Sequence, residues 1–190
     1  MLNVIIATRE SERALVPTLS SLVPGVTAGL LSEVVVADAG STDATAEVAD
    51  IAGCRFVASS ESLGVRLRSA ALSTRAPWLM FLHAGTVLEP GWVGVVDRFM
   101  EKADLMQGAR AAVFRPQATE AMLPGLGAVL AALRAAFAGA PKPEQGLVIA
   151  RPLYEELGGH PPHEKADAGL LRRLGRRRIV LLAAQAGAPR

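Results

Sequence analysis

The stretch from Glu33 to Asp43, which reads Glu-Val-Val-Val-Ala-Asp-Ala-Gly-Ser-Thr-Asp, decides the fold. Its first half, Val34 to Ala37, is a continuous apolar run of mostly β-branched residues, a pattern typical of a strand buried on both faces of a parallel sheet. Asp38 follows at the carboxyl end of that strand. Ligands of open α/β sheets bind in the crevice beyond these ends, where a carboxylate can accept hydrogen bonds from a ribose or a base. The stretch therefore predicts part of a nucleotide site.

The second half of the stretch predicts a turn into a helix. Gly40 gives the backbone the freedom that a tight turn needs, and Ser41 or Thr42 can act as the N-cap of a helix from Asp43 to Ile51. The same residues also fit a plain strand, turn and capped helix that binds no ligand. The motif alone leaves both interpretations open.

The length of the chain, 190 residues, suits one domain with a full core, so we expect a single domain over residues 1–190. Of the residues, 51% are hydrophobic. Many of these are alanines, and no uncharged apolar window of about 18 to 20 residues predicts a membrane-spanning helix. The N-terminal residues resemble a strand rather than a signal peptide, and the single cysteine, Cys54, fits a reducing compartment. These features predict a cytoplasmic protein.

The formal net charge of +2 is too small to indicate nucleic-acid binding. Positive charge is nevertheless concentrated near the C-terminus in an arginine cluster, which consists of Arg172, Arg173, Arg176, Arg177 and Arg178. Such a cluster is either a solvated helix face or a site for phosphate or anionic lipid headgroups, which would make the protein membrane-peripheral. No aromatic residues are interleaved with these arginines, so an RNA-binding role is not favoured.

Strands and helices are expected to alternate along the first third of the chain. Val4 to Ala7 predicts the first strand, and leucines at positions 15, 19 and 22 give the stripe of an amphipathic helix from Glu12 to Leu22. We expect Pro24-Gly25 to end this helix and Pro17 to be tolerated only in its first turn. A third strand is expected at Arg55 to Ala58. This order predicts a parallel sheet with right-handed crossovers and a crevice at its carboxyl edge.

The rest of the chain continues the alternation of helices and strands. The expected elements are a helix at Gly64–Ser73, a strand at Trp78–Leu82, a helix at Trp92–Lys102, a strand at Met106–Phe114, a helix at Leu123–Ala138, a loop at Gly139–Pro143, a strand ending at Ala150, helices at Pro152–Leu157 and Glu164–Leu174, and a strand at Ile179–Leu182. No internal repeat occurs.

Five ordered segments resemble family 2 glycosyltransferases of the GT-A fold, in particular the compact bacterial kind. The segments are Val4–Thr8, Val34–Asp43, Phe81–Thr86, Glu144-Gln145-Gly146 and Tyr154–Gly175. The resemblance implies an α/β fold, a Rossmann-like three-layer sandwich around a mainly parallel sheet. It also implies transfer of a sugar, with inversion, from a nucleotide-diphosphate sugar to a hydroxyl of a glycan or a lipid-linked acceptor.

The resemblance also implies a set of donor-binding residues. The nucleotide sugar is expected to contact Thr8, Glu10, Asp38, Gly40, Ser41, Arg66 and His83. Arg68 and the arginine cluster are further candidates for holding the diphosphate.

The first departure from the family pattern concerns the metal. An Asp after the fourth strand usually ligates a divalent ion, Mn²⁺ or Mg²⁺, that offsets the charge of the leaving diphosphate. This chain has Gly85 there, which has no side chain to coordinate an ion. His83 stands two residues earlier and can ligate a metal, bind a phosphate or serve as a structural residue. We therefore expect weak metal dependence.

The second departure concerns the base that deprotonates the acceptor. The family's Glu-Asp pair reads Glu164-Lys165 here, so a lysine holds the position that usually carries the base. Glu164 and Asp167 lie three apart on the expected last helix and can share a face toward the acceptor. Either can be the base, or both can be acids that favour a helix N-terminus. Lys165 would bring positive charge near the diphosphate.

Two functions follow from these patterns. The first is an active transferase with Glu164 or Asp167 as its base. The second is a catalytically impaired relative that binds a nucleotide or a partner without turnover, which Gly85 and Lys165 favour. A dinucleotide-binding enzyme is not favoured, because no Gly-x-Gly-x-x-Gly motif occurs.

Overall fold

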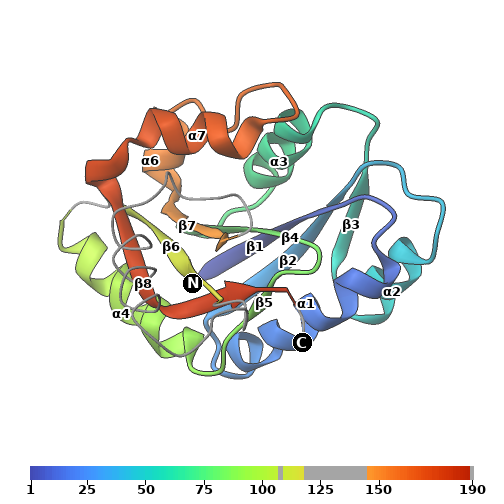
Figure 1. The fold of residues 1–190 in the computed structure, drawn as a ribbon, viewed down its shortest axis with the longest axis horizontal. Helices are drawn as coiled ribbons and strands as arrows, with labels where there is room; N and C mark the ends of the chain where they lie inside the picture. Colours follow the sequence, from blue (N-terminus) through green and yellow to red (C-terminus); the bar gives the residue numbers. More distant parts are fainter. Residues whose placement is uncertain (107–108, 118–144, 189–190) are drawn as a thin grey trace, which may run out of the picture.

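The computed structural model describes residues 1–106, 109–117 and 145–188. In this part of the chain, eight strands form one sheet in the order β3-β2-β1-β4-β7-β6-β8-β5 (Figure 1). The helix expected at Leu123–Ala138 and the loop at Gly139–Pro143 lie outside the described residues.

Parallel and antiparallel strand pairs divide the sheet. The strands are β1 (Leu2–Thr8), β2 (Leu31–Asp38), β3 (Arg55–Ala58), β4 (Trp78–His83), β5 (Val87–Leu88), β6 (Ala111–Pro116), β7 (Leu147–Ala150) and β8 (Ile179–Gly187). β1 pairs in parallel with β2 and β4, and β2 with β3, as the alternating elements predict. β7 runs antiparallel between β4 and β6, β6 pairs in parallel with β8, and β5 pairs antiparallel with β8. The sheet is therefore mixed, with a parallel half that brings the ends of β1, β2 and β4 to one edge.

Helices cover both faces of the sheet, which confirms the three-layer sandwich. They are α1 (Glu12–Thr27), α2 (Thr45–Ile51), α3 (Leu63–Leu72), α4 (Trp92–Asp104), α6 (Arg151–Glu156) and α7 (Ala166–Leu174), followed by the short 3₁₀ helix η2 (Arg176–Arg178). Figure 1 shows α1, α2 and α4 on one side and α3, α6 and α7 on the other. Within the described ranges, no helix is long and apolar enough to cross a membrane.

The core lies around β1, the strand between β2 and β4. All seven residues of β1 are buried, because neighbouring strands flank it and helices cover both of its faces. On β2 the residues Val35 to Asp38 are buried as well. This agrees with the continuous apolar run that predicted a strand buried on both faces.

Helix α1 does not end at Pro24-Gly25 as expected but continues to Thr27, and Pro17 is its sixth residue rather than part of its first turn. A Cβ at Gly25 would lie 2.7 Å from the indole ring of Trp92, so the glycine admits that ring against the helix. The Trp92 indole N–H also donates to the carbonyl of Ser21 at 2.9 Å. Packing of a distant aromatic residue therefore outweighs the local helix-breaking signal.

Other boundaries also differ from expectation. Helix α2 starts at Thr45 rather than Asp43 and has no side-chain N-cap. Helix α7 starts at Ala166 rather than Glu164. Strand β6 starts at Ala111 rather than Met106, and β8 continues to Gly187 because its second half pairs with β5.

Candidate functional site

The carboxylate of Asp38 is saturated by hydrogen bonds from the protein itself. Its Oδ1 accepts from the hydroxyls of Thr8 at 2.7 Å and Ser41 at 2.6 Å. Its Oδ2 accepts from the backbone N–H groups of Gly40 at 2.7 Å and Ser41 at 2.6 Å. Burial alone would raise the pKa of Asp38, but these hydrogen bonds, led by Ser41, hold it below its usual range. Asp38 is fully buried, and its carboxylate holds the turn after β2 together.

We expect Asp38→Asn to lower the free energy of unfolding by about 1 to 3 kcal/mol, because an amide cannot accept from all four donors and leaves buried N–H groups unpaired. Urea denaturation measures this loss. Asp50→Asn, at an exposed position of α2, is the matched control and should change stability little. If nucleotide affinity fell while stability held, Asp38 would instead be a ligand contact.

Side chains join the loop after β1 to the loop after β2. Glu10 Oε1 accepts from the backbone N–H of Thr42 at 2.9 Å, and the Glu10 N–H donates to the hydroxyl of Ser41 at 2.8 Å. The backbone N–H of Glu12 donates to Asp43 at 3.1 Å. Among described non-glycine residues, only Glu10 has a positive φ, 46°, a strained conformation that these contacts hold. The two loops thus form one unit at the carboxyl edge.

Arg66 of α3 contacts the same edge of the sheet through its guanidinium. Its Nη1 donates to the carbonyl oxygens of Ala37 at 2.6 Å and Thr8 at 3.4 Å, and its Nε donates to that of Glu61 at 3.2 Å. Burial lowers the pKa of Arg66, and the carboxylates of Glu164 and Asp38 partly offset this effect. A buried positive charge therefore lies where β1 and β2 end.

Asp167 lies between two histidines, His83 at the end of β4 and His160 in the loop after α6. Its Oδ2 is 3.1 Å from His83 Nε2. Its Oδ1 is 3.3 Å from His160 Nε2, close enough for an ion pair but not aligned for a hydrogen bond. His160 Nδ1 is in turn 2.9 Å from the hydroxyl of Tyr154. The side chains of His83, Asp167, His160 and Tyr154 thus form a continuous polar cluster between α7 and the end of β4.

Tyr154 and His160 contact each other twice. The backbone N–H of His160 donates to the Tyr154 oxygen at 3.2 Å, and the same oxygen lies 2.9 Å from His160 Nδ1. Burial raises the pKa of Tyr154 to about 12, so Tyr154 remains a neutral donor.

The surroundings of Asp167 favour its ionised form. Burial would raise its pKa, but the contacts with His160 and His83 outweigh burial and hold the pKa well below its usual range. Its side chain is 13% exposed. A carboxylate that resists protonation and lies against two rings is suited to orient His83 rather than to accept a proton from a substrate.

The low pKa of Asp167 predicts a pH dependence of stability. Because the folded-state pKa lies below the unfolded value of about 4, the contribution of Asp167 is fully present above that value and is lost as the pH falls toward the folded-state pKa. Denaturation at a series of pH values from neutral to about 3 should show this decline. Asp167→Asn should flatten it, and an equal slope in both proteins would contradict the assignment.

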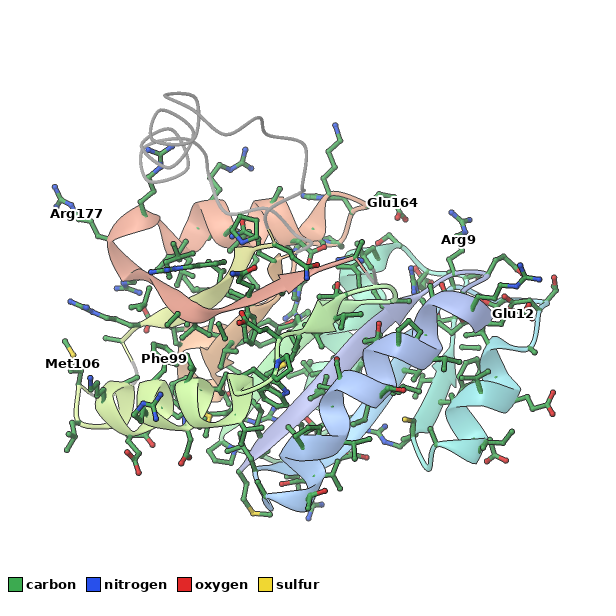
Figure 2. All side chains as sticks on the ribbon, turned by 60° about the horizontal axis from the view of Figure 1, so that its bottom comes forward. Arg9, Glu12, Phe99, Met106, Glu164 and Arg177 are labelled. Carbon is green, nitrogen blue, oxygen red and sulfur yellow. The ribbon has the colours of Figure 1, made fainter. Side chains whose placement is uncertain are left out.

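Glu164 and Asp167 do not share a helical face, contrary to the sequence-based expectation. Glu164 lies in the loop before α7, is exposed, and accepts from the backbone N–H of Leu63 through Oε1 at 3.3 Å. The N–H of Gly64 donates to the carbonyl of His163, also at 3.3 Å. These contacts dock the loop on the first turn of α3. Figure 2 shows Glu164 at the surface, toward the edge that carries Arg9 and Glu12.

The described residues do not form a metal site on their own. They contain no group of three or more His, Cys, Asp or Glu side chains placed to hold an ion. Gly85, which replaces the family's metal-binding Asp, has φ +91° and donates its N–H to Thr18 and Ala14 of α1. His83 contacts Asp167 through Nε2 and makes no described contact through Nδ1. The Nδ1 atom is therefore the candidate metal ligand of this region.

A hollow of about 430 Å³ adjoins Glu164 at the start of α7. Its lining residues are His163, Glu164, Lys165, Ala168, Gly169 and Arg172. The site therefore has two parts that the sequence did not separate: an edge formed by the ends of β1 and β2, and a hollow on the exposed side of α7.

Comparison with known proteins places this geometry in context. Residues 3–126 match the model of Glycosyl transferase family 2. No curated protein sequence matches the chain. Among solved structures, glucosyl-3-phosphoglycerate synthase from Mycobacterium tuberculosis, with Mn²⁺, UDP and glucosyl-3-phosphoglycerate, is 22% identical with a TM-score of 0.67, over 95% of this chain and 68% of that one.

Two further structures agree. The same synthase with Mn²⁺ and UDP-glucose is 23% identical with a TM-score of 0.68, again over 95% of this chain and 68% of that one. S. aureus TarS 1-349 is 16% identical with a TM-score of 0.68, over 98% of this chain and 60% of that one. At these identities the structures show the shared fold, which confirms the expected GT-A architecture.

Proposed function

The chain belongs to glycosyl transferase family 2 and is a glycosyltransferase that takes its sugar from a nucleotide-diphosphate donor; from this premise we propose that Glu164 is its base and that transfer inverts the anomeric carbon. The observation that supports this proposal is the difference between the two acids near α7. Asp167 is enclosed by histidines, whereas Glu164 is exposed beside the hollow. The match to the family favours this function over a relative without turnover.

In the proposed reaction, Glu164 accepts the proton of the acceptor hydroxyl. The hydroxyl oxygen attacks the anomeric carbon as the bond from that carbon to the diphosphate breaks, and the diphosphate leaves with the electron pair. The hydrogen bond from Leu63 to Oε1 orients the carboxylate and leaves Oε2 for the acceptor. His83, oriented by Asp167, is proposed to face the donor from the end of β4.

The donor is proposed to lie along the edge formed by β1, β2 and their two joined loops. Thr8, Asp38, Gly40 and Ser41 shape this edge through their mutual hydrogen bonds, and Glu10 holds the loops together. Arg66 is proposed to offset the charge of the diphosphate. Because the synthase structures contain UDP or UDP-glucose, we propose a uridine nucleotide as the donor.

The synthase structures contain Mn²⁺, which raises the question of a divalent ion at the corresponding place in this chain. A bound ion would offset charge on the diphosphate, and His83 is the described residue that would hold it. One histidine is an incomplete ligand set, because glycine at position 85 supplies no carboxylate beside it. We therefore propose that metal dependence is weak. Positive charge from Arg66 would then carry more of the stabilisation.

The test is release of UDP from UDP-glucose and from other nucleotide sugars, with Mn²⁺ and with EDTA. We expect measurable release, and we expect chelation to weaken UDP affinity by less than about a hundredfold, roughly 2.7 kcal/mol. A larger loss would mean that an ion is held by further ligands. If UDP raised the melting temperature but no donor released it, the chain would be a nucleotide-binding relative without turnover.

A peripheral membrane contact of a cytoplasmic enzyme remains a proposal that rests on part of the arginine cluster. Arg173 is engaged with the carbonyls of Leu157 and Gly159, and Arg178 pairs with Glu156 at 3.3 Å. Arg176 and Arg177 are exposed and make no ion pair within the described part of the chain. Binding to vesicles that contain anionic lipid, compared with neutral vesicles, tests this contact.

A further inference from the structure

The hollow beside Glu164 has a regular construction on α7. Lys165 is the N-cap residue of α7 and Arg172 lies in its last turn, seven residues or about 10 Å further along the axis, and both line the hollow. Ala168 and Gly169 lie between them, one turn from each. Two residues with long cationic side chains thus lie on either side of Ala168 and Gly169, the smallest residues that line the hollow.

The loop before α7 packs directly against Gly169. A Cβ at Gly169 would lie 2.6 Å from the ring of Pro161 and 3.3 Å from the ring of His163. The glycine therefore lets this loop approach the helix closely. Because Glu164 belongs to the same loop, the proposed base is held at the margin of the hollow.

Within the described part of the chain, no acidic side chain pairs with the two cations that border the hollow. Lys165 and Arg172 are exposed, and their side chains make no hydrogen bond or ion pair within residues 1–106, 109–117 and 145–188. In the same helix, Arg173 donates to two backbone carbonyls. The N-terminus of α7 adds partial positive charge. Among the described residues that line the hollow, Glu164 is the only acid.

We propose that this hollow binds an anionic group of the acceptor, a phosphate or a carboxylate, between Lys165 and Arg172. The inference rests on the proposed function, since it assigns the substrate class that Glu164 deprotonates. An acceptor anchored by its anion would bring a hydroxyl to Glu164, one residue from Lys165, and would hold it there as a positioned reactant. Lysine at position 165 is then a binding residue instead of a lost base.

The donor diphosphate is a second anionic group whose chemistry matches the cations of the hollow. It is assigned to the sheet edge near Arg66, which contacts the carbonyls of Thr8 and Ala37. The hollow opens instead on the exposed side of α7, where Ala168 and Arg172 are exposed. The two sites are therefore expected to be occupied together, and the experiment must separate them.

Isothermal titration with glycerol 3-phosphate and with glycerol, which differ only in the phosphate, tests the proposal on the full chain. We expect glycerol 3-phosphate to bind and glycerol to give no detectable heat. Lys165→Gln and Arg172→Gln should each weaken glycerol 3-phosphate binding by about tenfold or more. Arg98→Gln is the matched control, because Arg98 is exposed on α4 across the sheet, and it should change affinity by less than about twofold.

The same titration at saturating UDP distinguishes the two sources. Retained binding of glycerol 3-phosphate supports an acceptor site, whereas displacement by UDP would assign the hollow to the diphosphate and overturn the proposal. Absence of binding, or equal loss in Arg98→Gln, would also overturn it. UDP release from donor by the wild type is measured separately, so a failure of the proposed reaction is distinguishable from a failure of this binding site.

Discussion

Glu164→Gln is expected to slow sugar transfer by about 10² to 10⁴-fold while nucleotide affinity stays nearly unchanged. The amide keeps the size of the carboxylate and can still accept from the Leu63 N–H, but it cannot take a proton from the acceptor. The measurement is the rate of UDP release with saturating donor, together with the affinity for UDP. Where no acceptor is known, hydrolysis of the donor by water reports the same base.

Two variants control for this experiment. Glu61→Gln removes an exposed carboxylate near the start of α3 and should leave the rate within about twofold. Asp167→Asn should mainly lower stability, since it breaks a buried contact with His83 and His160. If Glu164→Gln retained full activity while Asp167→Asn lost it without unfolding, Asp167 would be the base. If both retained full activity, the base would lie elsewhere.

Gly64→Ala is expected to destabilise the fold by about 3 kcal/mol or more and to displace the loop that carries Glu164. A Cβ at Gly64 would lie 1.7 Å from the carbonyl oxygen of Pro161 and 2.9 Å from the side chain of Ala166. Because the nearest atom belongs to the backbone, no side-chain rotation relieves the clash. Urea denaturation measures the stability, and the rate of UDP release from donor reports the position of Glu164.

Gly94→Ala on α4 is the matched control for this substitution. Its added Cβ would meet only the mobile end of Arg98, at 3.4 Å, and alanine is the better helix former. We expect it to be neutral or stabilising by up to about 1 kcal/mol. Equal stability of Gly64→Ala and wild type would show that the 160–165 loop is not seated on α3 as described.

The parallel half of the sheet was predictable because its strands are short apolar runs with polar residues at their ends. The register of β1 against β2 places Thr8 beside Asp38, as the two strand ends suggested. The course of α1 was not predictable, because Gly25 accommodates Trp92, a residue 67 positions later in the chain. Only tertiary contact explains why Pro24-Gly25 does not end the helix.

The sequence named candidate site residues but could not give their arrangement. Asp38 was expected to face a ligand, and the structure fills all four of its acceptor positions. The contact of Asp167 with His160 and, through it, Tyr154 was missed, although a histidine seven residues before an acid was a visible signal. Helix α7 begins two residues late, which moves Glu164 off the helix and changes the geometry of the pair.

Helix α3 fixes the spacing between the two halves of the proposed reaction. Arg66 extends from it to the ends of β1 and β2, and the first turn of the same helix holds Glu164 through Leu63. The proposed cation beside the leaving group and the proposed base are therefore both anchored on α3. Arg172, on the exposed side of α7, makes no such contact, so on this proposal the choice of acceptor can change by substitution there while Arg66 and Glu164 keep their spacing.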